Sequence, residues 1–300
     1  MRLFDLEPDA GAPAGSEVVS PAPTAGTPNE TGTSERLRLV VAYDGSGFRG
    51  FAAQQGQRTV AGDLAAAIAK VVRHDVELTC AGRTDAGVHA LGQVVHFDAR
   101  PGADLARLVK SVNTMLAPAI VVRQAEVAPP AFDARRSARG RRYRYLVLEA
   151  STTDPLLAPA SWHVPGPLDL RAMAAGADAL IGEHDYRAFC RRAPGTTAES
   201  PIMRRVFDAR WSESLPTPDG LGHGERLLRF DIWAQSFCHQ MVRSVVGTLV
   251  EVGRGRRRAS DVTEMLRAEE RASGTTLAPP GGLCLVSVDY YDPGLDLSGS

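Results

Sequence analysis

Apolar and polar residues alternate where the chain's first regular pattern begins. Every second position is apolar there: Leu37, Leu39, Val41 and Tyr43. This period of two predicts a strand with one buried face. Thr59 can then cap a helix, because the apolar residues after it recur on one helical face; these are Leu64, Ile68, Val71 and Val72.

The first half of the chain continues this pattern with further elements. Strands fit residues 76–82 and 91–98, and a strand over 119–127 closes the half. Asp104 can cap a helix between them, whose apolar face holds Leu105, Leu108, Val112, Met115 and Leu116. The order β-α-β-β-α-β is that of a ferredoxin-like, or split βαβ, unit.

The second half repeats the order without a visible repeat of sequence. Strands fit 142–149, 205–213, 226–234 and 283–291, and helices fit 168–181, 236–252 and about 260–268. The pattern predicts an α+β protein built from two such units, each a mainly antiparallel sheet with helices on one face. We expect subdomains over 36–135 and 136–291.

The two ends of the chain differ from this body in composition. Residues 1–35 carry a net charge of −5 and few large apolar groups, which predicts a disordered acidic tail. Residues 292–300 resemble a short loose end. The remaining residues 36–300 carry a net charge of +4, and 32 of the chain's 34 basic residues are arginine, which suits phosphate binding.

Composition also excludes some classes of protein. No apolar run reaches membrane-spanning length and no secretory signal begins the chain, so we expect a cytoplasmic protein. The cysteines lie far apart, at positions 80, 190, 238 and 284, without metal-site spacing. Buried free thiols are favoured over a disulfide framework or a metal centre.

A polar turn bracketed by glycines follows the strand predicted over 76–82. It reads GRTDAGVHA over 82–90. Arg83 and Asp85 lie two positions apart, so their side chains leave on one side if the backbone stays extended. Glycine lets a ligand approach the backbone closely. The pattern alone fits a ligand site or a capped turn with a surface ion pair.

A basic segment interleaved with aromatic residues connects the two halves. It reads FDARRSARGRRYRY over 132–145 and holds six arginines between positions 135 and 144. Tyr143 and Tyr145 share one face of the predicted strand, and Arg142 and Arg144 take the other. Such a pattern is typical of RNA binding, although a solvated basic linker remains the alternative.

The helix predicted over 236–252 is apolar almost all round. Gln240, Arg243 and Gly247 form its narrow polar stripe. A charge on a buried helix needs a partner, and Gly247 leaves room beside it one turn on. The partner is a structural salt-bridge residue or a catalytic carboxylate.

In their common order and spacing, these segments resemble the bacterial tRNA pseudouridine synthase A family from about Arg36 to Tyr291. The resemblance also covers YDGSGF over 43–48, GQVVHF over 92–97, Asn113, GEHD over 182–185 and PPGGL over 279–283. It implies a pseudouridine synthase fold and an isomerase that forms pseudouridine at tRNA positions 38, 39 and 40. It further implies a homodimer that needs no cofactor and no metal.

The resemblance also assigns roles to individual residues. The catalytic carboxylate falls on Asp85, its supports on Arg83 and Arg243, and the active-site tyrosine that binds substrate on Tyr143. Arg83 is linked to base flipping. We expect further RNA contacts from Phe132, Arg135, Arg136, Arg139, Arg141, Arg191 and Arg192.

The chain departs from relatives at Phe51, Ala52 and Asp133, where they carry Trp, Gln and a basic residue. Two other functions fit the motifs. An RNA glycosidase could use Asp85, but it would need a second carboxylate, and none lies in the motif. A non-catalytic RNA-binding module would need only the basic cluster.

Overall fold

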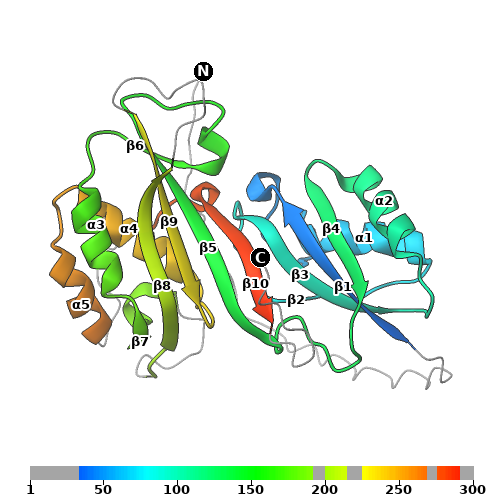
Figure 1. Ribbon diagram of the computed structural model, residues 1–300. Coiled ribbons are helices and arrows are strands. Elements are labelled where there is room, and N and C mark those ends of the chain that lie inside the picture. The colour runs from blue at the N-terminus through cyan, green and yellow to red at the C-terminus, as the bar shows by residue number, and fades with distance from the viewer. Residues whose placement is uncertain (1–33, 192–199, 215–224, 269–275, 291–300) are drawn as a thin grey trace, which may run out of the picture. The chain divides into compact units, whose positions relative to one another are not determined.

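The computed structural model describes residues 34–191, 200–214, 225–268 and 276–290 (Figure 1). Residues 1–33 of the acidic tail, the C-terminal end and Arg192 lie outside these residues. Glu35, the last residue of the expected tail, is the first residue of β1. Within the described part, no helix is long and apolar enough to cross a membrane.

The first half of the chain contains the predicted elements. They are β1 (Glu35–Tyr43), α1 (Val60–Val72), β2 (Thr79–Cys80), β3 (His89–Ala99), α2 (Leu105–Leu116) and β4 (Ile120–Val127). The Thr59 hydroxyl accepts a hydrogen bond from the Gly62 N–H, and the Asp104 carboxylate accepts one from the Arg107 N–H. Both predicted caps are therefore confirmed.

The second half adds two strands that the pattern did not predict, β6 (Trp162–Val164) and β7 (Gly182–Asp185). Its other elements are β5 (Ala138–Glu149), α3 (Leu170–Asp178), β8 (Met203–Ser214), β9 (Arg226–Ala234), α4 (Met241–Gly253), α5 (Ala259–Arg267) and β10 (Leu283–Tyr290). Helix α4 begins at Met241 and not at 236, because Gln240 has the left-handed φ of 64°. Residues 236–238 have no regular structure, and His239 and Gln240 form a turn.

One sheet runs through both halves in the order β4-β1-β3-β10-β5-β9-β8-β7. Figure 1 shows β10, in red, between β3 and β5. The strands of each half follow the ferredoxin-like order, β4-β1-β3-β2 in the first and β10-β5-β9-β8 in the second. The α+β prediction is confirmed, with the two units sharing a single, mostly antiparallel sheet.

The strand expected over 76–82 is reduced to the two residues of β2. Two strands share one edge of β3. Strand β10 pairs with that edge at His89 and Ala90, whereas β2 pairs with it at Val95 and His96. The last strand of the chain therefore reaches β3 beside the loop that carries Asp85.

Two cysteines contradict the expectation of free thiols. Cys190 and Cys238 are joined by a disulfide, with their Cα atoms 5.8 Å apart. Their separation of 48 residues hid the pair in the sequence, because only the fold brings the end of the 3-10 turn η3 (Arg187–Phe189) against the turn before α4. Cys80 and Cys284 are free and partly buried.

Candidate active site

The loop that carries Asp85 is held from inside the protein. The Tyr43 hydroxyl lies 2.8 Å from the Thr84 hydroxyl in the buried interior, and the Phe51 N–H donates to the Thr84 carbonyl at 3.1 Å. The buried Gln93 amide donates to the Gly82 carbonyl at 2.7 Å. These bonds fix the backbone on the N-terminal side of Asp85, whose side chain is 28% exposed.

Two glycines let a second loop pass close to this one. A Cβ on Gly45 would lie 2.0 Å from the Val88 carbonyl oxygen, and one on Gly50 would lie 3.0 Å from the Thr84 carbonyl oxygen. Gly50 also has a left-handed φ of 98°. The glycines of the YDGSGFRG segment therefore shape the Asp85 loop through backbone contact.

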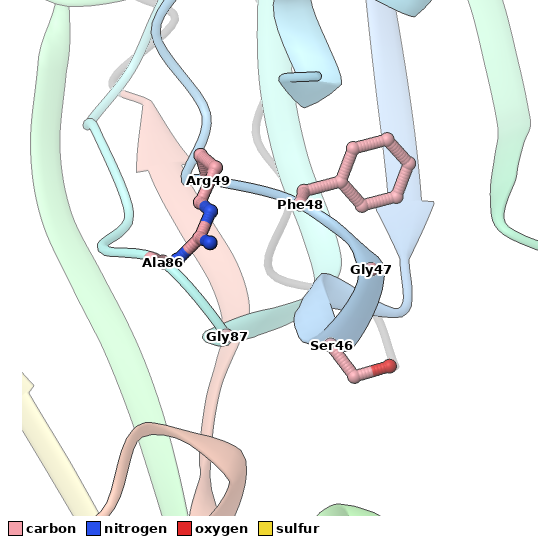
Figure 2. A pocket seen from close by; sticks show the side chains of 6 residues that line it. All are labelled: Ser46, Gly47, Phe48, Arg49, Ala86 and Gly87. Carbon is pink, nitrogen blue, oxygen red and sulfur yellow. The ribbon is translucent and has the colours of Figure 1, made fainter. Parts of the chain in front are cut away.

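A cleft of about 1350 Å³ opens at this loop. Arg83, Asp85, Tyr143 and Arg243 all line it. The structure thus brings together the four residues that the sequence assigned to the centre of the site. A smaller cavity of about 490 Å³ is lined in part by the same loop, and Figure 2 shows the Arg49 guanidinium directed toward Ala86 there.

Arg243 connects the first turn of α4 to the Asp85 loop. Its Nη1 lies 3.3 Å from Asp85 Oδ2, and its Nε donates to the Ala278 carbonyl at 2.8 Å. The Ala278 N–H donates back to the Arg243 carbonyl at 3.2 Å. A Cβ on Gly247 would lie 1.8 Å from the Thr276 carbonyl oxygen. Because Gly247 has no side chain, the segment that binds Arg243 can pass close to α4.

His239 also faces Asp85, and sequence reasoning did not single it out. Its Nε2 lies 3.4 Å from Asp85 Oδ1, and its side chain is 49% exposed. The residue falls within the span that the apolar pattern assigned to a helix. Its contact depends on the conformation of residues 236–240, for which the sequence carries no periodic signal.

Tyr143 lies on β5 with its ring packed edge-on against Phe237, the ring centroids 5.1 Å apart. Burial raises the pKa of its hydroxyl well above the usual range. The hydroxyl is therefore neutral at physiological pH, and the ring offers an apolar face at the cleft. As the alternation predicted, Tyr143 and Tyr145 are both buried on one side of β5.

The arginines of the basic segment divide into two groups. Arg141 donates to three backbone carbonyls, those of Ala81, Arg135 and Gln235, at 2.7–3.2 Å. Arg142 stacks on Trp233, and Arg144 pairs with Asp231 at 2.9 Å. The other group is solvent-exposed and consists of Arg135, Arg136 and Arg139.

The remaining predicted RNA contacts lie in different surroundings. Phe132 is partly buried against Tyr290 and His96 and is not among the residues that line the cleft. Arg191 is exposed, and its N–H donates to the His239 carbonyl at 2.9 Å. The acid at position 133 has a structural role, because its carboxylate accepts from the N–H groups of Arg135 and Arg136 at 2.8 Å.

No group of histidines, cysteines and carboxylates within the described residues has the arrangement of a metal site. The donors around Asp85 are a guanidinium and an imidazole. They suit a carboxylate that acts on an organic substrate directly.

Comparison with known proteins assigns the chain to a family. The model of the family described as tRNA pseudouridine synthase matches residues 39–135 and 177–291. The chain belongs to this family of RNA-modifying isomerases. Arg83, Asp85 and Arg243 lie within the matched ranges, and Tyr143 lies between them.

Relatives carry the likeness over most of the chain. A protein of Frankia casuarinae named tRNA pseudouridine synthase A is 43% identical over 85% of this chain and 89% of its own length. One of Aromatoleum aromaticum with the same name is 42% identical over 85% and 92%. Among solved structures, a chain of a Cbf5-Nop10-Gar1 complex matches 71% of this chain at 13% identity with a TM-score of 0.29.

Proposed function

We propose that this protein isomerises uridine to pseudouridine at positions 38, 39 and 40 of the tRNA anticodon stem-loop. Family membership supports the reaction and the tRNA substrate. The observation that carries the assignment to this site is the Asp85 carboxylate, which lines a large cleft and is held by Arg243.

The reaction moves a base without adding an atom. The bond between ribose C1′ and uracil N1 breaks, the base turns, and C5 bonds to C1′. The C5 hydrogen leaves as a proton, and N1 takes one up. A base inside a stem must first leave its stack, which costs roughly a few kcal/mol. The cleft, with its rigid loop, gives the extruded nucleotide a place to bind.

Each residue of the cleft has a role in this proposal. Asp85 acts as the charged carboxylate that reacts with the nucleotide. Arg243 aims it, because the guanidinium is itself fixed by Ala278. Tyr143, which lines the cleft, stacks on the extruded uracil, and its hydroxyl assists removal of the C5 proton. Arg83, exposed beside Asp85, occupies the space the base leaves.

The exposed arginines provide the attraction for the tRNA backbone. We assign this role to Arg83, Arg135, Arg136, Arg139 and Arg191, together with Arg192, and propose a homodimer that meets tRNA in the cytoplasm. Arg141 instead stabilises the site, because its donors already bind three carbonyls.

Release of tritium from tRNA labelled at uridine C5 tests the function. The protein should release tritium in proportion to pseudouridine formed, and replacement of uridine by cytidine at positions 38 to 40 should abolish the release. Free uracil in place of pseudouridine would identify an RNA glycosidase. Tight tRNA binding without either product would identify a binding module and contradict the proposal.

A further inference from the structure

The two oxygens of the Asp85 carboxylate have different neighbours. Arg243 Nη1 lies 3.3 Å from Oδ2, and His239 Nε2 lies 3.4 Å from Oδ1. An imidazole donates from Nε2 when it is charged and also when it is neutral with the proton on that nitrogen. Asp85 Oδ2 therefore accepts a hydrogen bond from Arg243, and the imidazole lies within ion-pairing distance of Oδ1.

The turn that presents His239 is fixed at three successive residues. Cys238 is bonded to Cys190, the His239 carbonyl accepts from the Arg191 N–H at 2.9 Å, and Gln240 has a φ of 64°. A left-handed conformation is costly for a residue other than glycine and persists where the surroundings enforce it. The imidazole therefore approaches Asp85 from a rigid backbone.

We infer that His239 is a positioning residue that holds the second oxygen of Asp85 and so fixes the plane of the carboxylate. This inference rests on the proposed function. With Arg243 alone, the carboxylate can rotate about its Cβ–Cγ bond while keeping one hydrogen bond. A guanidinium on one oxygen and an imidazole beside the other restrict this freedom, and well-oriented reacting groups account for a large part of enzymatic rate.

The alternative role for a half-exposed histidine in the cleft is direct contact with RNA. The geometry favours the carboxylate, because the ring nitrogen Nε2 lies 3.4 Å from Asp85 Oδ1. The two roles predict different kinetics. A positioning residue changes kcat, whereas a residue that only binds RNA changes KM for tRNA.

The kinetic test compares His239→Phe, which removes the donor, with His239→Gln, whose amide can donate to the same oxygen. We expect His239→Phe to lower kcat by about tenfold or more and to leave KM for tRNA unchanged. His239→Gln should recover most of the lost kcat. The matched control is His163→Phe on β6, where the histidine binds the Ala150 carbonyl and does not line the cleft. It should leave kcat unchanged.

Unchanged kcat in His239→Phe, a loss confined to KM, or equal losses in the Phe and Gln variants would each overturn the inference. An inactive parent protein would instead contradict the proposed function. A second measurement does not depend on activity. Asp85→Asn should shift the Nε2 resonance of His239 in ¹⁵N NMR spectra of the tRNA-free protein, and an unshifted resonance would show that the ring does not hold Asp85.

Discussion

The loop that carries Asp85 and the turn that carries His239 meet at one carboxylate, yet they are held by different means. The loop takes its shape from glycines that allow backbones to touch, Gly45 and Gly50 among them. The turn is held by a disulfide, one backbone hydrogen bond and a left-handed Gln240. The first kind of constraint is local and leaves a motif in the sequence, whereas the second depends on the fold.

Two arginines connect these regions from opposite sides. Arg243 reaches from α4 to Asp85, and Arg141 donates both to the Ala81 carbonyl beside the loop and to the Gln235 carbonyl beside the turn. The loop and the turn should therefore be coupled. Substitutions at these links separate chemistry from stability and from RNA binding.

Among substitutions at these links, the largest effect is expected at Arg243. Arg243→Met removes the donor on Asp85 Oδ2 and should lower kcat about 10²-fold or more, because a misplaced reacting group can cost that much. The loss of unfolding free energy should be less than the roughly 3 kcal/mol of a fully buried pair, since Asp85 is 28% exposed. Steady-state kinetics and urea denaturation measure the two effects.

Arg243→Lys is the control that keeps the positive charge and removes the geometry of the guanidinium. The guanidinium binds Asp85 and the Ala278 carbonyl at the same time. A lysine ammonium is a compact single charge and does not reproduce both contacts. We expect the Lys variant to have an activity between that of the Met variant and that of the parent protein. Full activity in the Met variant would show that the link is not needed.

Arg141 and Arg135 should respond in opposite ways. Arg141→Gln leaves up to three carbonyls without a donor and should lower the unfolding free energy by about 1–3 kcal/mol, with no change in the salt dependence of tRNA binding. Arg135→Gln should keep the stability and reduce the slope of log K against log salt by about 0.7–0.9. Binding measured over a salt series distinguishes them, and the reverse result would contradict the division of the basic segment.

A smaller effect is expected at Asp133, whose turn presents the Arg135 carbonyl to Arg141. Burial raises the pKa of Asp133, but hydrogen bonds from the backbone of Arg136 and Arg135 outweigh it and hold the pKa below its usual value. The charged Asp133 therefore stabilises the fold at pH values above the pKa of the unfolded state, which is about 3.9. This stabilisation is lost as the pH falls through the lower pKa of the folded state.

Asp133→Ala should cost about 1 kcal/mol at pH 7, and the difference from the parent should narrow below about pH 4. Asp133→Asn keeps a hydrogen-bond acceptor, so it should lower the unfolding free energy at pH 7 by less than Asp133→Ala does. Urea denaturation at the two pH values measures both. A constant difference across this range would show that the charge of Asp133 does not contribute.

Most helices and strands followed from periodicity, because one buried face imposes a period of two or 3.6 residues. The misses have physical reasons. Short β6 and β7 carry too few residues to show a period, and only Thr79 and Cys80 of the strand expected over 76–82 pair with β3 as β2. The helix predicted from 236 overran its true start, since nothing local marks Gln240 as left-handed.

The site divides in the same way. Asp85, Arg83, Tyr143 and Arg243 came from motifs, and the structure brings them to one cleft. His239 and the Cys190–Cys238 bond did not, because each depends on contacts between residues distant in sequence. The hydrogen bonds of Arg141 to backbone carbonyls could not be predicted either, since composition does not distinguish an arginine that binds carbonyls from one that is available to bind phosphate.

Asp85→Asn tests the central claim most directly. The change keeps the shape of the side chain and its place between Arg243 and His239 while it removes the charge. Affinity for tRNA comes mainly from contacts to phosphate, so the variant should bind tRNA as well as the parent or slightly better. It should form no pseudouridine, measured as tritium released from uridine C5. Substantial turnover by a verified Asp85→Asn protein would contradict the assignment of Asp85 as the catalytic carboxylate.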